Sequence, residues 1–287
     1  MFSQTAFIKH LAALFVITIA FASGACAALQ PIDATGPRAN TPAYPIMLPD
    51  SAARLEQAST AWYQMSQRYG AMMQNFARLN PYTGTVMNLP AERGPIVLPK
   101  VGTDATQTEE QTRESLRRFI AEWHELIGAD ANDLSLVERT DQANGMKVAR
   151  YEQKPFRYPL RGGYGNLVIQ FASDREVKDL SSTCIPNADR LQAALNGLTP
   201  KVNAAQAAEH VRSKSFVATN VTGVGQQTFT LPANATAAAS ELVVYALPAP
   251  DQSNGLQLRL AWEIQVTNGP VKTVYLDAIS DQVIAVA

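Results

Sequence analysis

Three short runs near the middle of the chain show the strand pattern of apolar and polar positions. The two kinds of residue nearly alternate over residues 146–152, and further extended runs cover residues 167–171 and 177–180. Turn chemistry fills residues 155–163, and Ser173-Asp174 separates the last two runs. Because a period of two places alternate side chains on one face, the pattern predicts three strands of an antiparallel sheet.

Residues 108–127 show the helical pattern instead. Thr108 and Gln111 have the spacing of a capping box, and Gly128 is placed to end the helix. An amphipathic helix needs a sheet to cover, and the three predicted strands supply one. The apolar positions at helical spacing are Leu116, Phe119, Ile120, Trp123, Leu126 and Ile127.

A longer helix is predicted over residues 50–80, stopped by Asn80-Pro81. Its apolar positions are spaced alternately by three and four residues, which is a heptad seam. The seam can dock on a partner, pair with its own copy or pack along this protein's own sheets, and we favour the last. Gly70 inside the helix weakens it by ~1 kcal/mol relative to alanine. The seam consists of Leu55, Ala58, Trp62, Met65, Tyr69, Met72, Phe76 and Leu79.

The C-terminal third repeats the order of helix and then strands. Asn203 and Gln206 can cap a helix within residues 199–213, and residues 216–239 are predicted to be a loop-rich connection. Asn268-Gly269 is a strong hairpin signal between two of the strands. Four strands are predicted, over residues 241–247, 256–266, 271–278 and 282–286. The fold class is therefore α+β, with two units of helix packed on antiparallel sheet, preceded by a long N-terminal helix.

The N-terminus has the pattern of a secretory signal. Lys9 precedes an apolar run over residues 11–22 that is too short to span a bilayer, which takes roughly 20 apolar residues. Cleavage after Ala22 and after Ala27 both fit, and residues 1–27 are assigned to the signal. Ser23-Gly24-Ala25-Cys26 also resembles a lipobox, so Cys26 is a candidate for lipidation. We expect an exported protein that is periplasmic, outer-membrane-anchored or extracellular, with residues 28–49 as a Pro-rich tether.

Charge and cysteine content narrow the class of protein further. The chain has 24 basic and 25 acidic residues, and this balance argues against a nucleic-acid partner, which requires a basic face. Cys26 and Cys184 are the two cysteines, and signal cleavage at Ala27 or lipidation leaves Cys184 without an intramolecular partner. The fold is therefore not expected to depend on a disulfide, and 287 residues are enough to bury a core without one.

Residues that could carry catalysis are few. His124-Glu125 resembles the start of the HExxH zinc motif, but Gly128 stands where the second histidine belongs. His210 lies on a different predicted helix, and no carboxylate or thiolate cluster accompanies either histidine. We therefore expect no catalytic residue, no metal site and no cofactor, and we do not expect an enzyme.

Two stretches resemble a known family. Gly145, the run Val148-Ala149-Arg150-Tyr151-Glu152-Gln153, the pair Gly162-Gly163 and the strand Leu167-Val168-Ile169-Gln170-Phe171 resemble the core of thermolysin/fungalysin-type propeptides. Thr83-Gly84-Thr85 is similar to the strand that opens many of them. Leu242-Val243-Val244-Tyr245, Leu260-Ala261-Trp262-Glu263-Ile264 and Val274-Tyr275-Leu276-Asp277-Ala278 resemble the PepSY domain that follows in such propeptides.

The resemblance implies a domain layout and a role. Residues 81–198 would form a propeptide domain and residues 199–287 a PepSY-like domain, both of the cystatin-like or PepSY-like kind. The chain stops at Ala287, so it is either a stand-alone propeptide-like protein or a fragment that lacks a catalytic domain.

The family's propeptides serve as folding templates and inhibitors, so a non-catalytic module that binds and inhibits or chaperones a protein partner is implied. A metalloprotease is the leading candidate for that partner. The alternative is an envelope structural or assembly protein that forms a homo-oligomer through residues 51–79. The candidate partner-binding residues are Arg150, Gln153, Phe156, Tyr158, Tyr164, Trp62, Tyr69 and Phe76.

Overall fold

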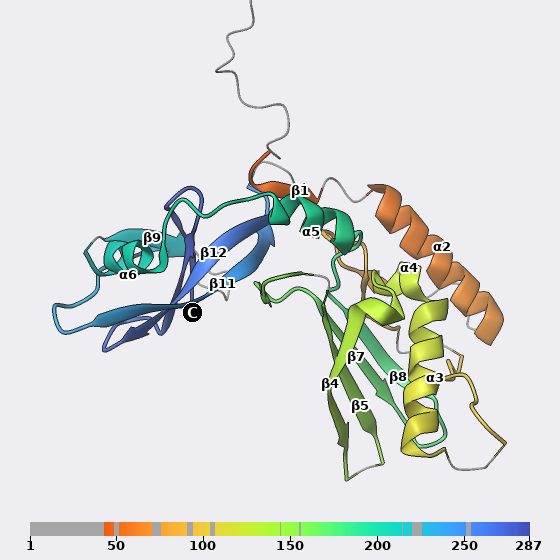
Figure 1. Cartoon of the computed structure of the whole chain (residues 1–287). Helices are drawn as coiled ribbons and strands as arrows, with labels where there is room; N and C mark the ends of the chain where they lie inside the picture. Colours follow the sequence, from red (N-terminus) through yellow and green to blue (C-terminus); the bar gives the residue numbers. More distant parts are fainter. Residues whose placement is uncertain are drawn as a thin grey trace, which may run out of the picture. The chain divides into compact units, whose positions relative to one another are not determined.

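The structure of the chain is a computed structural model that describes residues 43–48, 52–70, 76–90, 94–103, 107–143, 145–154, 156–213, 215–219, 226–250 and 254–287. Helices and largely antiparallel sheets make up a mixed α+β fold, as the sequence predicted (Figure 1). The predicted signal with Cys26, and the tether up to Pro42, lie outside the described residues. Among the described helices, none is both long and apolar enough to cross a membrane.

The first sheet has four antiparallel strands in the order β4-β5-β7-β8. Strands β5 (Lys147–Gln153), β7 (Asn166–Phe171) and β8 (Val177–Ser182) are the three that the alternating pattern predicted. The fourth, β4 (Leu134–Asp141), was not predicted. Its second half is polar, with Glu138, Arg139 and Asp141, and a bulge after Leu136 interrupts its alternation. An edge strand of this kind carries little hydrophobic signal.

Three helices accompany this sheet: α2 (Ala52–Tyr69), α3 (Glu109–Glu122) and α4 (His124–Ile127). The capping box between Thr108 and Gln111 is confirmed, with a 3.2 Å bond from the Gln111 N–H to Thr108 Oγ1 and a 2.9 Å return bond. Gly128 ends α4 in the left-handed conformation at φ 83°, as predicted. A Cβ at this position would lie 2.3 Å from Thr85 Cγ2, so only glycine fits without displacement.

The prediction of one helix over residues 50–80 was wrong in its second half. Helix α2 ends at Tyr69, Gly70 has a left-handed φ of 64°, and Arg78–Leu79 forms strand β2 instead. Strand β2 pairs antiparallel with β3 (Val86–Asn88), which follows the predicted turn with Gly84. A glycine in the left-handed region stops a helix because it turns the chain away from the helical path.

A single core joins these helices to the first sheet. Ala149, Leu167, Ile169 and Leu180 face it from the strands, and each is fully buried. Helices contribute Ala58, Trp62, Met65, Leu116, Phe119, Ile120 and Leu126 to the same cluster. Full burial of each large aliphatic or aromatic side chain stabilises the fold by about 1.5–3 kcal/mol. The seam of α2 therefore packs on the protein's own core, which is the interpretation that we favoured.

The second sheet is formed by the four C-terminal strands that the sequence predicted: β11 (Thr236–Pro248), β12 (Leu256–Thr267), β13 (Thr273–Asp277) and β14 (Val283–Val286). Helix α6 (Ala204–Ser213) packs against this sheet through Ala207 and Val211. Its predicted capping box is confirmed, because Asn203 and Gln206 exchange bonds of 2.9 and 3.0 Å.

Residues 216–239 were predicted as loop, and this prediction was wrong in part. They include the paired strands β9 (Phe216–Thr219) and β10 (Gln226–Phe229) and the first residues of β11. Phe216 and Phe229 stack with ring centroids 5.9 Å apart. The strand signal was weak because few large apolar residues occur among small and polar ones. Helix α5 (Ala188–Asn196) and the short η1 (Ala131–Asp133) were not predicted either.

Two very short strands extend the second sheet. Strand β1 (Ile46–Leu48) pairs antiparallel with Leu256–Leu258 of β12, and β6 (Leu160–Arg161) pairs in parallel with Val244 and Tyr245 of β11. A second core lies where they attach. It includes Ile46, Leu48, Phe156, Leu191, Leu195, Val244 and Leu258. Segments from the end of the predicted tether and from between β5 and β7 are thus built into the C-terminal sheet.

Candidate functional site

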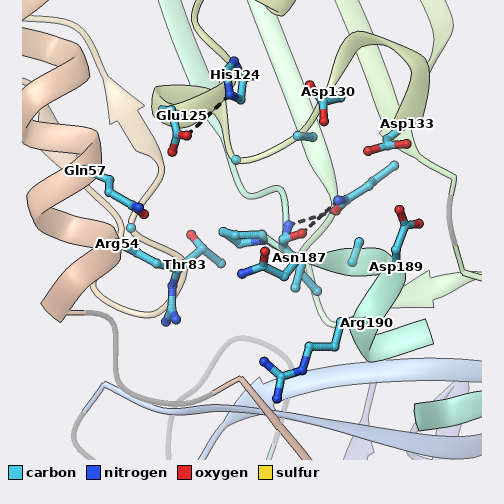
Figure 2. Close-up of a pocket in the computed structure, with 17 residues that line it drawn as sticks. Arg54, Gln57, Thr83, His124, Glu125, Asp130, Asp133, Asn187, Asp189 and Arg190 are labelled. Carbon is cyan, nitrogen blue, oxygen red and sulfur yellow. Dashed lines mark hydrogen bonds and ion pairs between the residues drawn. The ribbon is translucent and has the colours of Figure 1, made fainter. Parts of the chain in front are cut away.

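A polar cleft of about 350 Å³ opens among loops on the helical side of the first sheet (Figure 2). We call it the loop cleft. The N-terminal part of α2, the turn at Thr83-Gly84, the end of α4, η1 and the start of α5 all contribute to it. Its polar lining includes Arg54, Gln57, Thr83, His124, Glu125, Asp130, Asp133, Gln153, Asn187, Asp189 and Arg190.

A buried amide clamp forms part of the cleft lining. Gln153 donates its Nε2 to the carbonyl oxygen of Ile185 at 2.9 Å, and the Ile185 N–H donates to Gln153 Oε1 at 2.8 Å. These two bonds tie the end of β5 to the segment that leads into α5. Because both side-chain groups of a buried amide are satisfied, the lining is held in one arrangement.

Buried hydroxyl groups hold the neighbouring wall. Thr85 Oγ1 donates to the carbonyl oxygen of Ser182 at 2.7 Å, and Ser182 Oγ donates to that of Ile127 at 2.6 Å. Thr83 Oγ1 lies 2.8 Å from Thr85 Oγ1 in the same network. The turn before β3, the end of β8 and the end of α4 are therefore fixed relative to one another before any ligand arrives.

Negative charge gathers on one side of the cleft. Figure 2 shows Asp130, Asp133 and Asp189 on one side and Arg54 and Thr83 on the other. Burial raises the pKa of Asp133, and the negative charges of Asp189 and Asp130 raise it further. Within the described part of the chain, none of the three aspartates forms an ion pair. A cation placed among them would relieve their repulsion.

The two histidines in the described residues contact a backbone carbonyl and carboxylates. His124 Nδ1 lies 3.1 Å from the carbonyl oxygen of Ala121, and its Nε2 lies 3.4 Å from Glu125 of the same helix. His210 Nδ1 instead lies 2.8 Å from Asp281. Among the described residues, no group of three or more histidine, cysteine or acidic side chains could hold a metal ion.

The turn that was predicted to meet a partner is used inside the protein. Phe156 is buried, and Tyr158 and Tyr164 pack against the core at the attachment of β6. Arg161 forms ion pairs of 2.7 Å with Glu263 and 3.0 Å with Glu241. The turn pairs with β11 through Leu160 and Arg161, and its aromatic rings pack in a core, whereas Arg157, Pro159 and the two glycines stay exposed.

The other predicted residues fall into three environments. Arg150 is exposed on the face of the first sheet opposite the helices, where it pairs with Glu138 at 3.0 Å. Gln153 is buried in the amide clamp.

The predicted residues of the α2 seam lie in different surroundings. Trp62 is 4% exposed, and Tyr69 packs on Trp123 and donates its hydroxyl to the Val97 carbonyl at 3.1 Å. Phe76 is 78% exposed. Trp62 is a core residue and Tyr69 is half-buried against the same core, which agrees with the interpretation that the seam packs on this protein.

Sequence reasoning missed the loop cleft apart from Gln153 and the His124-Glu125 pair. Arg54, Thr83, Asp130 and Asp189 lie far apart in the sequence, in separate turns and helix ends. The one local signal was the density of polar residues around Gly128 and Asn187, and it does not say which loops meet.

Comparison with known proteins adds little. No protein-family model matches the chain, and no curated protein matches it either. Among solved structures, the chain is similar to an uncharacterized protein from Eubacterium rectale ATCC 33656, whose crystal structure was determined at 1.45 Å resolution. The TM-score is 0.28 at 9% sequence identity, with 80% of each chain covered. A likeness at this level indicates neither a shared function nor a shared fold.

Proposed function

We propose that this protein is a non-catalytic, propeptide-like module that binds a protein partner, and that the loop cleft receives a basic side chain of that partner. The observation that carries the proposal is the convergence of Asp130, Asp133 and Asp189 on one open cleft. Burial and the repulsion from Asp189 and Asp130 raise the pKa of Asp133, and a lysine or arginine placed among the three carboxylates would relieve that repulsion. The fixed walls of the cleft reduce the ordering cost of binding.

Two arginines also line the cleft. Arg54 lies on the side opposite the aspartates and donates Nη2 to the carbonyl oxygen of Tyr82 at 3.2 Å, whereas Arg190 lies beside Asp189 on α5 (Figure 2). A volume of about 350 Å³ falls within the range of ordinary binding pockets.

The nature of the partner is proposed from the sequence resemblance. The motifs around Arg150 and Trp262 are similar to those of thermolysin/fungalysin-type propeptides and their PepSY domains. We therefore propose a propeptide-like unit over residues 81–198 and a PepSY-like unit over residues 199–287, with cystatin-like or PepSY-like folds. An exported protein that inhibits or chaperones a metalloprotease follows from this proposal.

The alternative is an assembly protein that associates through residues 51–79. Trp62 and Met65 of the seam are already buried in the protein's own core. Self-association through α2 would therefore have to use its outer face, where Tyr63 is 51% exposed. No further observation in the described residues favours this alternative.

The test is capture followed by inhibition. The mature chain is used as bait on envelope and culture-supernatant fractions of the producing cells, and each captured protease is assayed for peptide cleavage. We expect a captured metalloprotease that loses activity on binding. The double variant Asp133→Asn, Asp189→Asn should weaken binding by about tenfold or more, because it removes two of the three charges that attract the basic side chain.

Asp141→Asn is the matched control, because Asp141 is an exposed aspartate at the end of β4 and does not line the cleft. It should leave binding unchanged. Equal binding by the double variant and the native chain would exclude the loop cleft as the contact surface. Capture of envelope structural proteins or of the chain itself, with no protease inhibited, would support the assembly alternative instead.

A further inference from the structure

Besides the loop cleft, the free edge of the first sheet could bind a ligand through its backbone groups and side chains. Strand β4 is the last in the order β4-β5-β7-β8 and is labelled at the margin of that sheet in Figure 1. It pairs with β5 on one side, and no described strand pairs with its other side. A bulge after Leu136 leaves Val137 half exposed and separates the first three residues of the edge from the four that follow it.

Hydrogen-bond direction along this edge follows from its neighbours. The Lys154 N–H donates to the Asp133 carbonyl at 2.8 Å, whereas the Gln153 N–H donates to Gly165, on the β7 side, at 2.8 Å. Backbone groups of successive strand residues point to opposite sides. Ser135, which stands opposite Glu152, therefore directs its N–H and C=O toward β5, and Leu134 and Leu136 direct theirs toward the free edge.

A groove of about 310 Å³ lies between this edge and helix α3. We call it the β4 groove. Leu134, Leu136 and Tyr151 line it from the sheet, and Ile120 lines it from α3. The apolar side chains and the outward backbone groups thus belong to the same two residues of β4. An added strand would place the side chain that stands opposite Leu136 on the same face, into the groove.

The rim of the groove is basic. Arg113 and Arg117 line it from α3, each with a side chain more than half exposed, and no carboxylate is among the described residues that line it. Their ion pairs with Glu109 and Glu114 are made along the helix, so the groove itself presents guanidinium groups above an apolar floor. Burial raises the pKa of Tyr151 to about 12, so its phenol stays neutral and adds no negative charge.

We propose that the β4 groove binds an extended peptide segment of a protein partner, which pairs with Leu134 and Leu136, inserts an apolar side chain and places a carboxylate at Arg113 and Arg117. Only an extended backbone supplies donors and acceptors at the spacing of this edge, and strand addition beside a helix is a recurring mode of peptide recognition. A second copy of this chain is a poorer occupant, because edge-to-edge pairing brings like-charged rims together. The inference rests on the proposed function only in taking the partner to be a protein.

The probe is a fluorescein-labelled peptide of alternating threonine and valine, with a central leucine and an aspartate two positions later. Residues two apart share one face of a strand, so leucine reaches the groove while aspartate reaches the rim. Fluorescence anisotropy with the mature chain should show saturable binding. A peptide with lysine in place of aspartate should bind about tenfold more weakly or worse.

Backbone pairing is tested on the peptide, which leaves the protein unchanged. Two versions of the peptide carry N-methyl groups on every second backbone amide. One version is methylated at the odd-numbered amides and the other at the even-numbered amides. Because only one set faces β4, one version should lose binding and the other should keep it. Loss in both versions or in neither would overturn strand addition.

The rim is tested with a double variant that combines Arg113→Gln and Arg117→Gln. The control is the single variant Arg118→Gln. Arg118 is on the same helix, is equally exposed and does not line the groove. The double variant should bind the probe about tenfold more weakly, and the control should change binding less than about twofold. Equal effects of the two would overturn the assignment of the rim. If the protein formed a dimer, seen as a doubled apparent mass, and the double variant dimerised more strongly, a second copy would be the occupant. That result would overturn the proposal.

The result separates this inference from the proposed function. Saturable, N-methyl-sensitive peptide binding without capture of any inhibited protease would leave the β4 groove standing and remove the metalloprotease. If the chain captured and inhibited a protease but bound no probe peptide, the proposed function would stand and the β4 groove proposal would fall.

Discussion

At the scale of single residues, environment decides what each reactive group can do. Cys184 is fully buried at the end of β8, where its N–H donates to Ser182 Oγ at 3.1 Å. Burial raises the pKa of its thiol to about 11. A thiol in such a place is a small apolar side chain of the core, since the reactive thiolate is scarcely formed. The sequence showed a cysteine but not its burial.

Alkylation by iodoacetamide at pH 8 tests this in a Cys26→Ser chain, where Cys184 is the single thiol. We expect the native protein to react about a hundredfold more slowly than the urea-unfolded chain, because its pKa of about 11 lies well above the ordinary value of about 9. Since the folded pKa is raised, the contribution of Cys184 to stability is full below about pH 9 and declines as the pH rises to about 11. Equal rates in the two states would contradict burial of Cys184.

At the scale of elements, the heptad seam of helix α2 fits two interpretations: packing on the protein's own core or docking on another chain. The heptad seam predicted a helix and an apolar face, and both are present in α2. The sequence left open what the seam packs against. In the structure, Ala58, Trp62 and Met65 pack in the core that they share with α3 and the first sheet. The adjacent Tyr63 points to solvent because helical neighbours lie about 100° apart.

Substitution of these two neighbours separates core from surface. Trp62→Ala should lower the free energy of unfolding by about 3–5 kcal/mol, because it leaves a cavity in the core. Tyr63→Ala should change it by no more than about 0.5 kcal/mol. Urea denaturation followed by fluorescence and circular dichroism measures both. If Trp62→Ala left stability unchanged but dissociated an oligomer, the seam would be an interface between copies.

At the scale of the whole molecule, the two sheets share segments. Strand β6 leaves the first sheet between β5 and β7 and pairs with β11, where Arg161 joins Glu241 and Glu263. Gly162 has φ 92°, and a Cβ there would lie 2.0 Å from the carbonyl oxygen of Ala246. The turn therefore needs glycine for its conformation and for its close approach to β11.

A pair of adjacent glycines tests this link. Gly162→Ala should cost at least about 2 kcal/mol of stability, because the new Cβ collides with the β11 backbone. Gly163→Ala should cost only about 1 kcal/mol, since its φ of 81° is strained for alanine but nothing lies within 4 Å of the added carbon. Urea denaturation compares the two variants. Equal costs would show that β6 does not press against β11 in solution.

Much of the local structure could be predicted. Thr108 with Gln111 and Asn203 with Gln206 mark helix starts, Gly128 marks a helix end, and period-two alternation marks β5. Each of these signals lies within a few residues of the element that it defines, because capping bonds and side-chain alternation are local. Strands β4 and β9 escaped prediction, since bulges, charges and small residues weaken their alternation.

The sequence by itself determined the fold class, the helix caps and which side chains could enter a core. Only the tertiary structure decided that residues 156–164 pack on β11, and that Asp130, Asp133 and Asp189 share one cleft. It also decided that Leu134 and Leu136 line a groove at a free edge. Propensity, capping and alternation act between near neighbours in the sequence. Clefts and exposed edges depend on which distant segments meet and which strand has a partner on each side, and those choices are made by packing of the whole chain.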